Sequence, residues 1–205
     1  MGVFGWALIG YACGTLPSTW IVASRRGLHG VLDDVRRNAG GADAHVLLQQ
    51  AAGRAATIAA VMDVLKGFTP VIVATRVAGP YAIPACAIGA VAGHCWPPYL
   101  GRFAGRGLST AAGAFLGFLP VEMIIAGVVR VIGSRLKAGG LASTIGFAAI
   151  PFIAWWRGQP LPYLIAAGVI NVLIFVRRLE GIGSQVAAGS SLRDAAVRRL
   201  VFDES

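Results

Sequence analysis

Apolar residues fill long stretches of this chain that contain few or no charged residues, and these stretches predict transmembrane helices. The first covers residues 3–24 and has 22 residues, and an α-helix of that length can cross a hydrocarbon core of ~30 Å at ~1.5 Å per residue. No Lys or Arg precedes it and Arg25 follows it directly, so we expect a retained membrane helix rather than a cleaved signal peptide. Further apolar stretches lie at residues 57–75, 81–92, 108–134, 141–156 and 162–176.

The stretch at residues 108–134 decides how many times the chain crosses the membrane. If Pro120 separates two short helices there are seven crossings, which puts 15 Lys and Arg residues on one side and 2 on the other, with Lys66 inside a helix. A single span here changes the division to 8 against 9. Because short cytoplasmic loops collect Lys and Arg, the pattern favours seven helices, with the N-terminus outside and the C-terminus in the cytoplasm. The predicted cytoplasmic segments are residues 25–50, 93–107 and 135–140 and the tail 177–205.

The composition agrees with a membrane protein. Of the 205 residues 56% are hydrophobic and 13% are charged, and the mean hydropathy is +0.70, whereas about a quarter of the residues of a soluble domain are charged. A water-soluble globule, a disordered chain and a disulfide scaffold are therefore excluded. The net charge of +9 is largely explained by topology, so nucleic acid is not expected as a partner. We predict one all-α membrane domain over residues 1–205, a compact bundle of seven transmembrane helices, several of them short, in the inner (plasma) membrane.

Arg106 lies between two glycines in a predicted cytoplasmic loop that leads into the next helix. Gly105 and Gly107 let backbone N–H groups approach an anion closely, and the N-terminus of the following helix, with Thr110 in its first turn, points at the same place. His94 begins this polar segment. The pattern predicts a cradle for a phosphate or an oxyanion, and the alternative is an ordinary loop with a cytoplasmic arginine.

Three further places on the same side combine cations or hydroxyls with glycines. Arg36, Arg37 and Asn38 precede a pair of glycines, and a solvated interfacial loop is the alternative there. Ser143 lies near the start of a predicted helix, where an N-cap role explains it without a ligand. Arg178 ends the last predicted helix, and cations are expected at a helix C-terminus without any function. All are candidates for binding an anionic substrate.

Asp63 and Lys66 lie inside a predicted span, where charged residues are costly. They are three residues apart on one helix face and can neutralise each other, so we expect a structural ion pair rather than a pair that lines a cleft. The three His and three Cys residues show no spacing typical of metal ligands. No metal site is predicted.

Five segments together carry a resemblance to a known family. Residues 14–17 read G-T-L-P, similar to G-S-I-P, residues 62–67 read M-D-V-L-K-G, similar to L-D-x-L-K-G, and residues 141–143 match the end of S-L-A-S. The longest match, residues 93–110, is similar to G-H-x-F-P-x-F-x-x-F-x-G-G-K-G-x-A-T without a gap, and residues 177–182 are similar to R-H-x-E-N-I. By these motifs the chain resembles the bacterial acyl-phosphate-dependent glycerol-3-phosphate acyltransferases of the integral-membrane PlsY type.

The resemblance implies a seven-helix fold with the N-terminus outside and an acyltransferase reaction of phospholipid synthesis. A fatty acyl group passes from acyl phosphate to glycerol 3-phosphate, which yields lysophosphatidic acid and inorganic phosphate. The implied partners are membrane lipid and these two anionic small molecules, which a basic cleft can concentrate and orient. Acyl phosphate is an activated anhydride, so neither a cofactor nor a dedicated nucleophile is implied, and no catalytic residue is assigned.

The chain departs from the family pattern at several motif positions. The serine and arginine of the motif G-S-G-N-x-G-A-T-N-x-L-R fall on Ala39 and Gln49, Arg106 replaces a lysine and Arg178 replaces a histidine. Arginine keeps the charge of lysine but is bulkier and forked. These departures keep a second hypothesis open, a catalytically degenerate relative that serves a larger complex as a membrane subunit or lipid-binding scaffold, with a protein partner. A small-solute transporter is disfavoured, because inverted repeats and paired broken helices are not evident.

Overall fold

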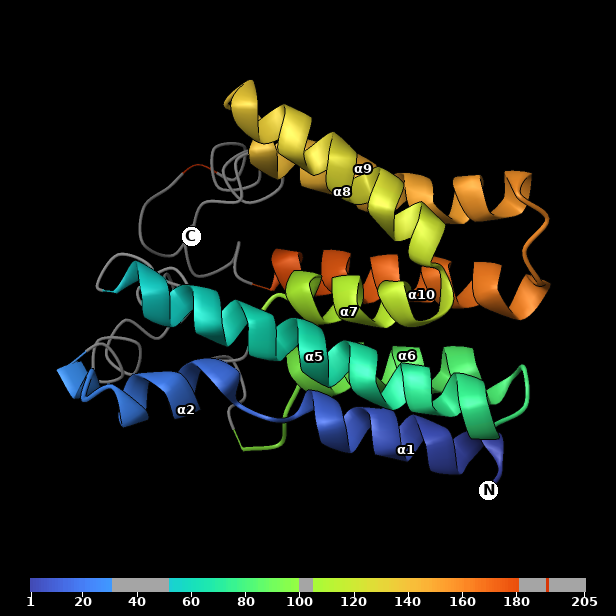
Figure 1. The fold of residues 1–205 in the computed structure, drawn as a ribbon, viewed down its shortest axis with the longest axis horizontal. Helices are drawn as coiled ribbons and strands as arrows, with labels where there is room; N and C mark the ends of the chain where they lie inside the picture. The colour runs from blue at the N-terminus through green and yellow to red at the C-terminus, as the bar shows by residue number, and fades with distance from the viewer. Residues whose placement is uncertain (31–51, 100–104, 181–190, 192–205) are drawn as a thin grey trace.

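The computed structural model describes residues 1–30, 52–99, 105–180 and 191, and every regular element within them is an α-helix (Figure 1). The all-α fold class is therefore confirmed for this part of the chain. The described helices are α1 (Val3–Gly14), α2 (Ser18–Arg25), α5 (Gly53–Val77), α6 (Ala82–Cys95), α7 (Leu108–Phe118), α8 (Pro120–Arg135), α9 (Gly139–Trp156) and α10 (Leu161–Leu179).

Successive helices alternate in direction along one axis of the bundle (Figure 1). α1 and α2 together run one way, and each helix from α5 onward reverses the direction of the one before. The reversal between α7 and α8 falls at Leu119, whose φ of −133° and ψ of 58° interrupt the helix, and Pro120 is the first residue of α8. Because proline lacks an N–H and disfavours helical geometry in the residue before it, residues 108–134 form two helices, as predicted. The number of membrane crossings stays a prediction.

The prediction of one continuous helix over residues 3–24 is wrong. α1 ends at Gly14 and α2 begins at Ser18, and Pro17 lies in the break with φ −85° and ψ 71°. Proline cannot donate the hydrogen bond that would continue α1. The break releases the carbonyl of Leu16 from the helical hydrogen-bond pattern, and Lys66 Nζ donates to it at 2.6 Å. A side chain from another helix thus stabilises the interruption.

Three of the described helices, α5, α9 and α10, are long and apolar enough to cross a membrane. α7 has 11 residues and reaches only ~17 Å at ~1.5 Å per residue, but neighbouring helices bury most of its side chains. Large apolar side chains face outward from other helices instead, and Phe4, Leu8 and Phe152 are 87%, 68% and 72% exposed. A short covered helix surrounded by outward apolar side chains suits a bundle in lipid.

Glycines let the helices that carry the polar residues approach closely. A Cβ on Gly67 of α5 would lie 2.1 Å from the carbonyl oxygen of Thr110 in α7, and one on Gly113 would lie 1.9 Å from the carbonyl oxygen of Val64. α1 meets α6 in the same way at Gly10. Small residues at such interfaces are typical of membrane helices. Here they fix α5 against α7 and α1 against α6.

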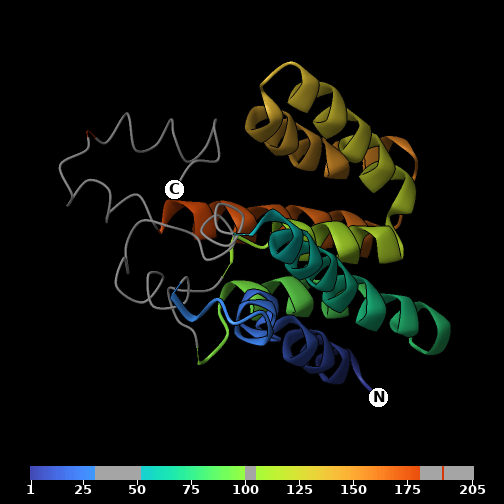
Figure 2. The same cartoon turned by 60° about the vertical axis from the view of Figure 1, so that its left-hand side comes forward.

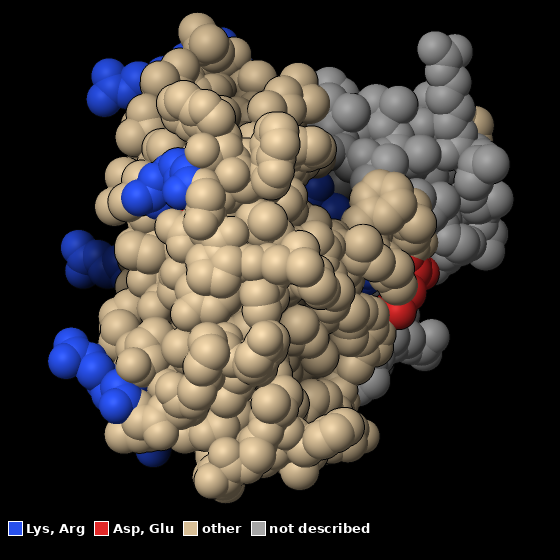
Figure 3. Space-filling model, turned by 90° about the vertical axis from the view of Figure 1, so that its right-hand side faces the viewer, with Lys and Arg blue, Asp and Glu red and all other residues tan. Residues whose placement is uncertain are grey.

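Basic residues at the helix ends gather at one end of the bundle. α2, α8 and α10 end there and α5 and α9 begin there (Figure 1), which brings Arg25, Arg54, Arg135 and Arg178 to this end. Uncharged side chains cover most of the opposite end, which carries the N-terminus (Figure 3). α8 and α9 form a closely packed pair beside the other helices (Figure 2). This arrangement agrees with the predicted division of Lys and Arg residues between the two sides of the membrane. The orientation of the bundle in a membrane stays a prediction.

Candidate functional site

Gly105, Arg106 and Gly107 lead into α7 and lie against the end of α6. Gly107 is the N-cap of α7 and has φ +86°, a left-handed conformation that favours glycine. A Cβ on Gly107 would lie 2.7 Å from Cys95 Sγ, and a Cβ on Gly105 would lie 2.2 Å from His94 Nε2. A side chain at either position would therefore have to displace a side chain at the end of α6.

The N-terminus of α7 carries no side-chain cap. An uncapped helix N-terminus presents backbone N–H donors and a partial positive charge, and the half-buried Arg106 directly precedes it. Thr110, in the first turn, is fully buried, and its Oγ1 has no hydrogen-bond partner in the described part of the chain. This combination of N–H groups, a cation and a hydroxyl can bind an anion.

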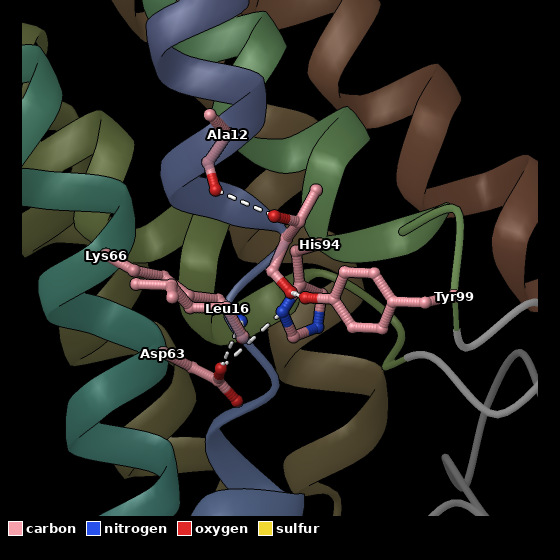
Figure 4. A network of polar contacts seen from close by, with 7 residues as sticks. Ala12, Leu16, Asp63, Lys66, His94 and Tyr99 are labelled. Carbon is pink, nitrogen blue, oxygen red and sulfur yellow. Dashed lines mark hydrogen bonds and ion pairs between the residues drawn. The ribbon is translucent and has the colours of Figure 1, made fainter.

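A buried polar network joins α5, α6 and the break between α1 and α2 (Figure 4). Lys66 Nζ lies 2.7 Å from Asp63 Oδ1 and 2.6 Å from the Leu16 carbonyl oxygen. His94 Nδ1 lies 3.5 Å from the same Asp63 oxygen. The predicted ion pair is therefore confirmed, and the structure adds His94 to it. Because His94 Nε2 packs against Gly105, the network holds the segment before α7 in place.

The end of α10 contacts the same segment from another side. Arg177 Nε donates to the Gly105 carbonyl at 3.3 Å, and the Arg177 guanidinium forms an ion pair with Glu180. Trp96 directly follows α6, and its Nε1 donates to Glu180 Oε1 at 2.9 Å. Arg177 and Arg178 are 8% and 3% exposed, so they are not the solvated cations expected at an ordinary helix end. The motif at residues 177–182 includes Arg177 and Glu180, but spacing along the chain does not show their contacts with Gly105 and Trp96.

Ser143 lies inside α9, whose N-cap is Ala138, so the N-cap interpretation of Ser143 is wrong. Ser143 Oγ accepts a hydrogen bond from Arg130 Nη1 at 2.6 Å. The next residue, Thr144, accepts one from Arg178 Nη1 at 2.8 Å. Arg178 is thus brought to α9 as a neighbour of Ser143. In the sequence, Arg130 is one of the 15 basic residues on the predicted cytoplasmic side, and spacing along the chain does not show its contact with Ser143.

The candidate site residues fall into two groups at the same end of the bundle. One group surrounds the start of α7 and the other the start of α9, and adjacent arginines at the end of α10 contact both. Arg36, Arg37 and Asn38 lie outside the described residues, and the meeting of all these groups at one phosphate stays a prediction. Within the described ranges, no three His, Cys, Asp or Glu side chains are grouped so that they could hold a metal.

Comparison of the sequence with known proteins gives consistent matches. The family model described as glycerol-3-phosphate acyltransferase matches residues 4–188. A glycerol-3-phosphate acyltransferase of Rubrobacter xylanophilus is 32% identical over 176 residues, which cover 84% of this chain and 86% of the relative. One of Campylobacter concisus is 35% identical over 148 residues, which cover 69% and 73%. These matches confirm the resemblance carried by the motifs, and they do not support the alternative of a degenerate subunit.

The fold is similar to that of solved crystal structures of PlsY (YgiH), an integral membrane glycerol 3-phosphate acyltransferase. One of these is a lysophosphatidic acid form and the other a glycerol 3-phosphate form. Each has a TM-score of 0.76 and 22% identity, with 93% of this chain and 95% of the other chain covered. At this identity the likeness concerns the fold, that of an all-helical integral membrane protein.

Proposed function

The chain belongs to the glycerol-3-phosphate acyltransferase family, and from this premise we propose that it transfers a fatty acyl group from acyl phosphate to glycerol 3-phosphate. The products are lysophosphatidic acid and inorganic phosphate, and the reaction serves phospholipid synthesis. The observation that carries the proposal is the start of α7, where Arg106 and an uncapped helix N-terminus lie against His94 and Cys95 through glycine contacts. A phosphate group suits this place, because a helix N-terminus and an arginine both favour an anion.

The residues of the chain bind and orient the substrates, and the reaction needs no protein nucleophile. A hydroxyl oxygen of glycerol 3-phosphate attacks the acyl carbonyl carbon, and the bond from that carbon to the phosphate oxygen breaks. The phosphate leaves with the electron pair and takes up the proton that the hydroxyl loses. N–H groups and guanidinium groups stabilise the negative charge that develops during the step, and binding both substrates in one place favours their reaction.

His94 acts as a positioning residue in this scheme. Its Nδ1 faces Asp63 and its Nε2 packs against Gly105, so protein groups lie at both ring nitrogens. The Asp63–Lys66 ion pair in turn fixes the acidic partner of His94. His94 therefore supports the segment that presents Arg106 to a substrate.

We further propose that the site faces the cytoplasm from the inner membrane, with seven crossings and the N-terminus outside. Support comes from the basic residues at the end of the bundle that carries the site, since cytoplasmic segments are enriched in Lys and Arg. Arg76 and Arg157 lie at the ends of α5 and α9, which are at the opposite end of the bundle (Figure 1).

Product formation by the purified chain in detergent tests the reaction. Acyl phosphate and labelled glycerol 3-phosphate should yield labelled lysophosphatidic acid. Arg106→Ala should lower kcat/KM roughly ten- to hundredfold, the effect of losing a hydrogen bond to a charged group, whereas Arg76→Ala at the opposite end should retain wild-type activity. No product with any of several acyl chain lengths would refute the proposal, and an inactive chain that co-purifies with a stoichiometric partner would favour the subunit hypothesis.

A further inference from the structure

Two neighbouring hydroxyls near the start of α9 each hold an arginine from a different helix. Ser143 Oγ accepts from Arg130 Nη1 of α8 at 2.6 Å, and Thr144 Oγ1 accepts from Arg178 Nη1 of α10 at 2.8 Å. α8 and α10 both pack against α9. The two arginines therefore approach consecutive positions of α9 from two of its neighbours.

The protons of both hydroxyls are already donated within α9. Ser143 Oγ donates to the Gly139 carbonyl at 2.8 Å, and Thr144 Oγ1 donates to the Gly140 carbonyl at 3.1 Å. A hydroxyl has one proton to donate and lone pairs that accept. Each side chain thus offers its arginine an acceptor while its proton stays bonded to the helix. Ser143 and Thr144 are suited to position guanidinium groups rather than to donate to a ligand.

Arg130 lies inside α8 and not at the end of the helix, where cations at a membrane boundary are usually found. Arg135 is the last residue of α8, and Arg130 precedes it by a distance of ~7.5 Å at ~1.5 Å per residue. The residues on either side of it, Val129 and Val131, are apolar, as is most of the helix. The Arg130 side chain is exposed on the bundle. In a helix that crosses the membrane, as proposed for α8, a charged residue away from the helix end is costly and indicates a functional role.

The partner of Arg130 also differs from the partners of other cations in the bundle. Lys66, Arg157 and Arg177 each form an ion pair with a carboxylate. The guanidinium of Arg130 contacts the neutral Ser143 hydroxyl, and it forms no ion pair within the described residues. A guanidinium has five N–H donors. A hydroxyl partner orients this group without neutralising it, so its charge remains available to an anion.

We propose that Arg130 is a further substrate-binding residue, which binds the phosphate group of a substrate and is held in position by Ser143. This inference rests on the proposed function, because it assigns a role in the same reaction, and a phosphate is the group that both substrates share. Arg178 is held in the same manner one residue further along α9, and the adjacent Arg177 contacts Gly105 before α7. Arg130 extends the phosphate-binding region from α7 and α10 to α8.

Steady-state kinetics of Arg130→Ala, Arg130→Lys and Arg135→Ala in detergent test the assignment. In one series glycerol 3-phosphate is varied at saturating acyl phosphate, and in the other acyl phosphate is varied at saturating glycerol 3-phosphate. The substrate whose KM rises is the one whose phosphate Arg130 binds. Arg130→Ala should raise one KM roughly ten- to hundredfold, and Arg130→Lys should recover part of this loss. Arg130 and Arg135 are both exposed, but Arg135 is the last residue of α8 and makes no hydrogen bond to a hydroxyl of α9 within the described residues. Arg135→Ala should therefore change KM by less than about twofold. An Arg130→Ala protein that keeps both KM values, or that loses kcat alone, overturns the proposal.

Phosphate binding without turnover separates this proposal from the proposed function. At one phosphate concentration, inorganic phosphate should raise the thermal unfolding midpoint of the wild type and of Arg135→Ala more than that of Arg130→Ala, even if no lysophosphatidic acid forms. An equal rise in Arg130→Ala, or no rise in the wild type, overturns the assignment. Adding Ser143→Ala to Arg130→Ala should raise KM no further, because Ser143 acts through Arg130, and additive losses would contradict its positioning role.

Discussion

Replacement of Gly107 by alanine tests whether the segment before α7 needs the geometry found here. Gly107 has φ +86°, and a Cβ at this position would lie 2.7 Å from Cys95 Sγ. The left-handed conformation costs a residue with a side chain roughly 1–2 kcal/mol, and crowding a packed site costs about 1–3 kcal/mol. We therefore expect Gly107→Ala to lower the free energy of unfolding by about 2–5 kcal/mol. The start of α7 should also shift, which raises the KM for glycerol 3-phosphate.

Thermal unfolding in detergent measures this loss, with Gly127→Ala as the matched control. Gly127 lies in α8 with open space where a Cβ would stand, so alanine there should leave the midpoint unchanged or raise it, since alanine favours a helix over glycine by about 1 kcal/mol. At roughly 2–4 °C per kcal/mol, Gly107→Ala should unfold well below the control. Adding Cys95→Ala to Gly107→Ala should recover the stability lost through crowding, whereas the stability lost through the left-handed backbone conformation should remain lost. Equal midpoints for Gly107→Ala and Gly127→Ala would refute the reasoning.

Two further predictions concern the buried ion pair and the orientation of the bundle. Asp63→Asn should destabilise the protein by about 3–5 kcal/mol in thermal unfolding, because Lys66 is left buried without its carboxylate. The double variant Asp63→Asn/Lys66→Met should recover most of the loss, and a stable single variant would contradict the prediction. In a cysteine-free background, a cysteine at Gly79 should react with a membrane-impermeant maleimide on intact cells, and one at Leu136 only after permeabilisation. The opposite labelling would reverse the proposed orientation.

Proline and charge together predicted most helix boundaries, but a proline alone does not decide where a helix ends. Pro120 begins α8 and Pro17 lies just after α1, whereas Pro70 and Pro151 lie inside α5 and α9. The break at Pro17 is stabilised by another helix, because Lys66 of α5 donates to the Leu16 carbonyl that the break releases. The uncharged residues around Pro17 carry no sign of this distant lysine. One helix was therefore predicted where the structure has two.

The sequence predicts those site residues that are close to one another along the chain. Glycines, an arginine and a helix start are neighbours around Arg106, so their joint meaning is visible in the sequence. The contacts that complete the site join distant residues, and Gly105 and Arg177 are 72 positions apart. The contact of Arg130 with Ser143 spans 13 positions and two helices. Such pairs depend on how closely the helices pack, which glycine contacts determine and spacing along the chain does not reveal.

Two cations of the bundle show how a binding charge differs from a structural one. Lys66 is neutralised by Asp63, so Lys66→Met should destabilise the protein with or without substrate, because a buried carboxylate loses its partner. Arg130 is exposed, is oriented by a hydroxyl and has no carboxylate partner in the described part of the chain, so replacing it leaves no buried carboxylate without its partner. Arg130→Met should therefore leave the unfolding midpoint of the empty protein unchanged or raise it, while reducing the rise of the midpoint with inorganic phosphate. A midpoint that falls in Arg130→Met as far as in Lys66→Met would show that both cations are structural.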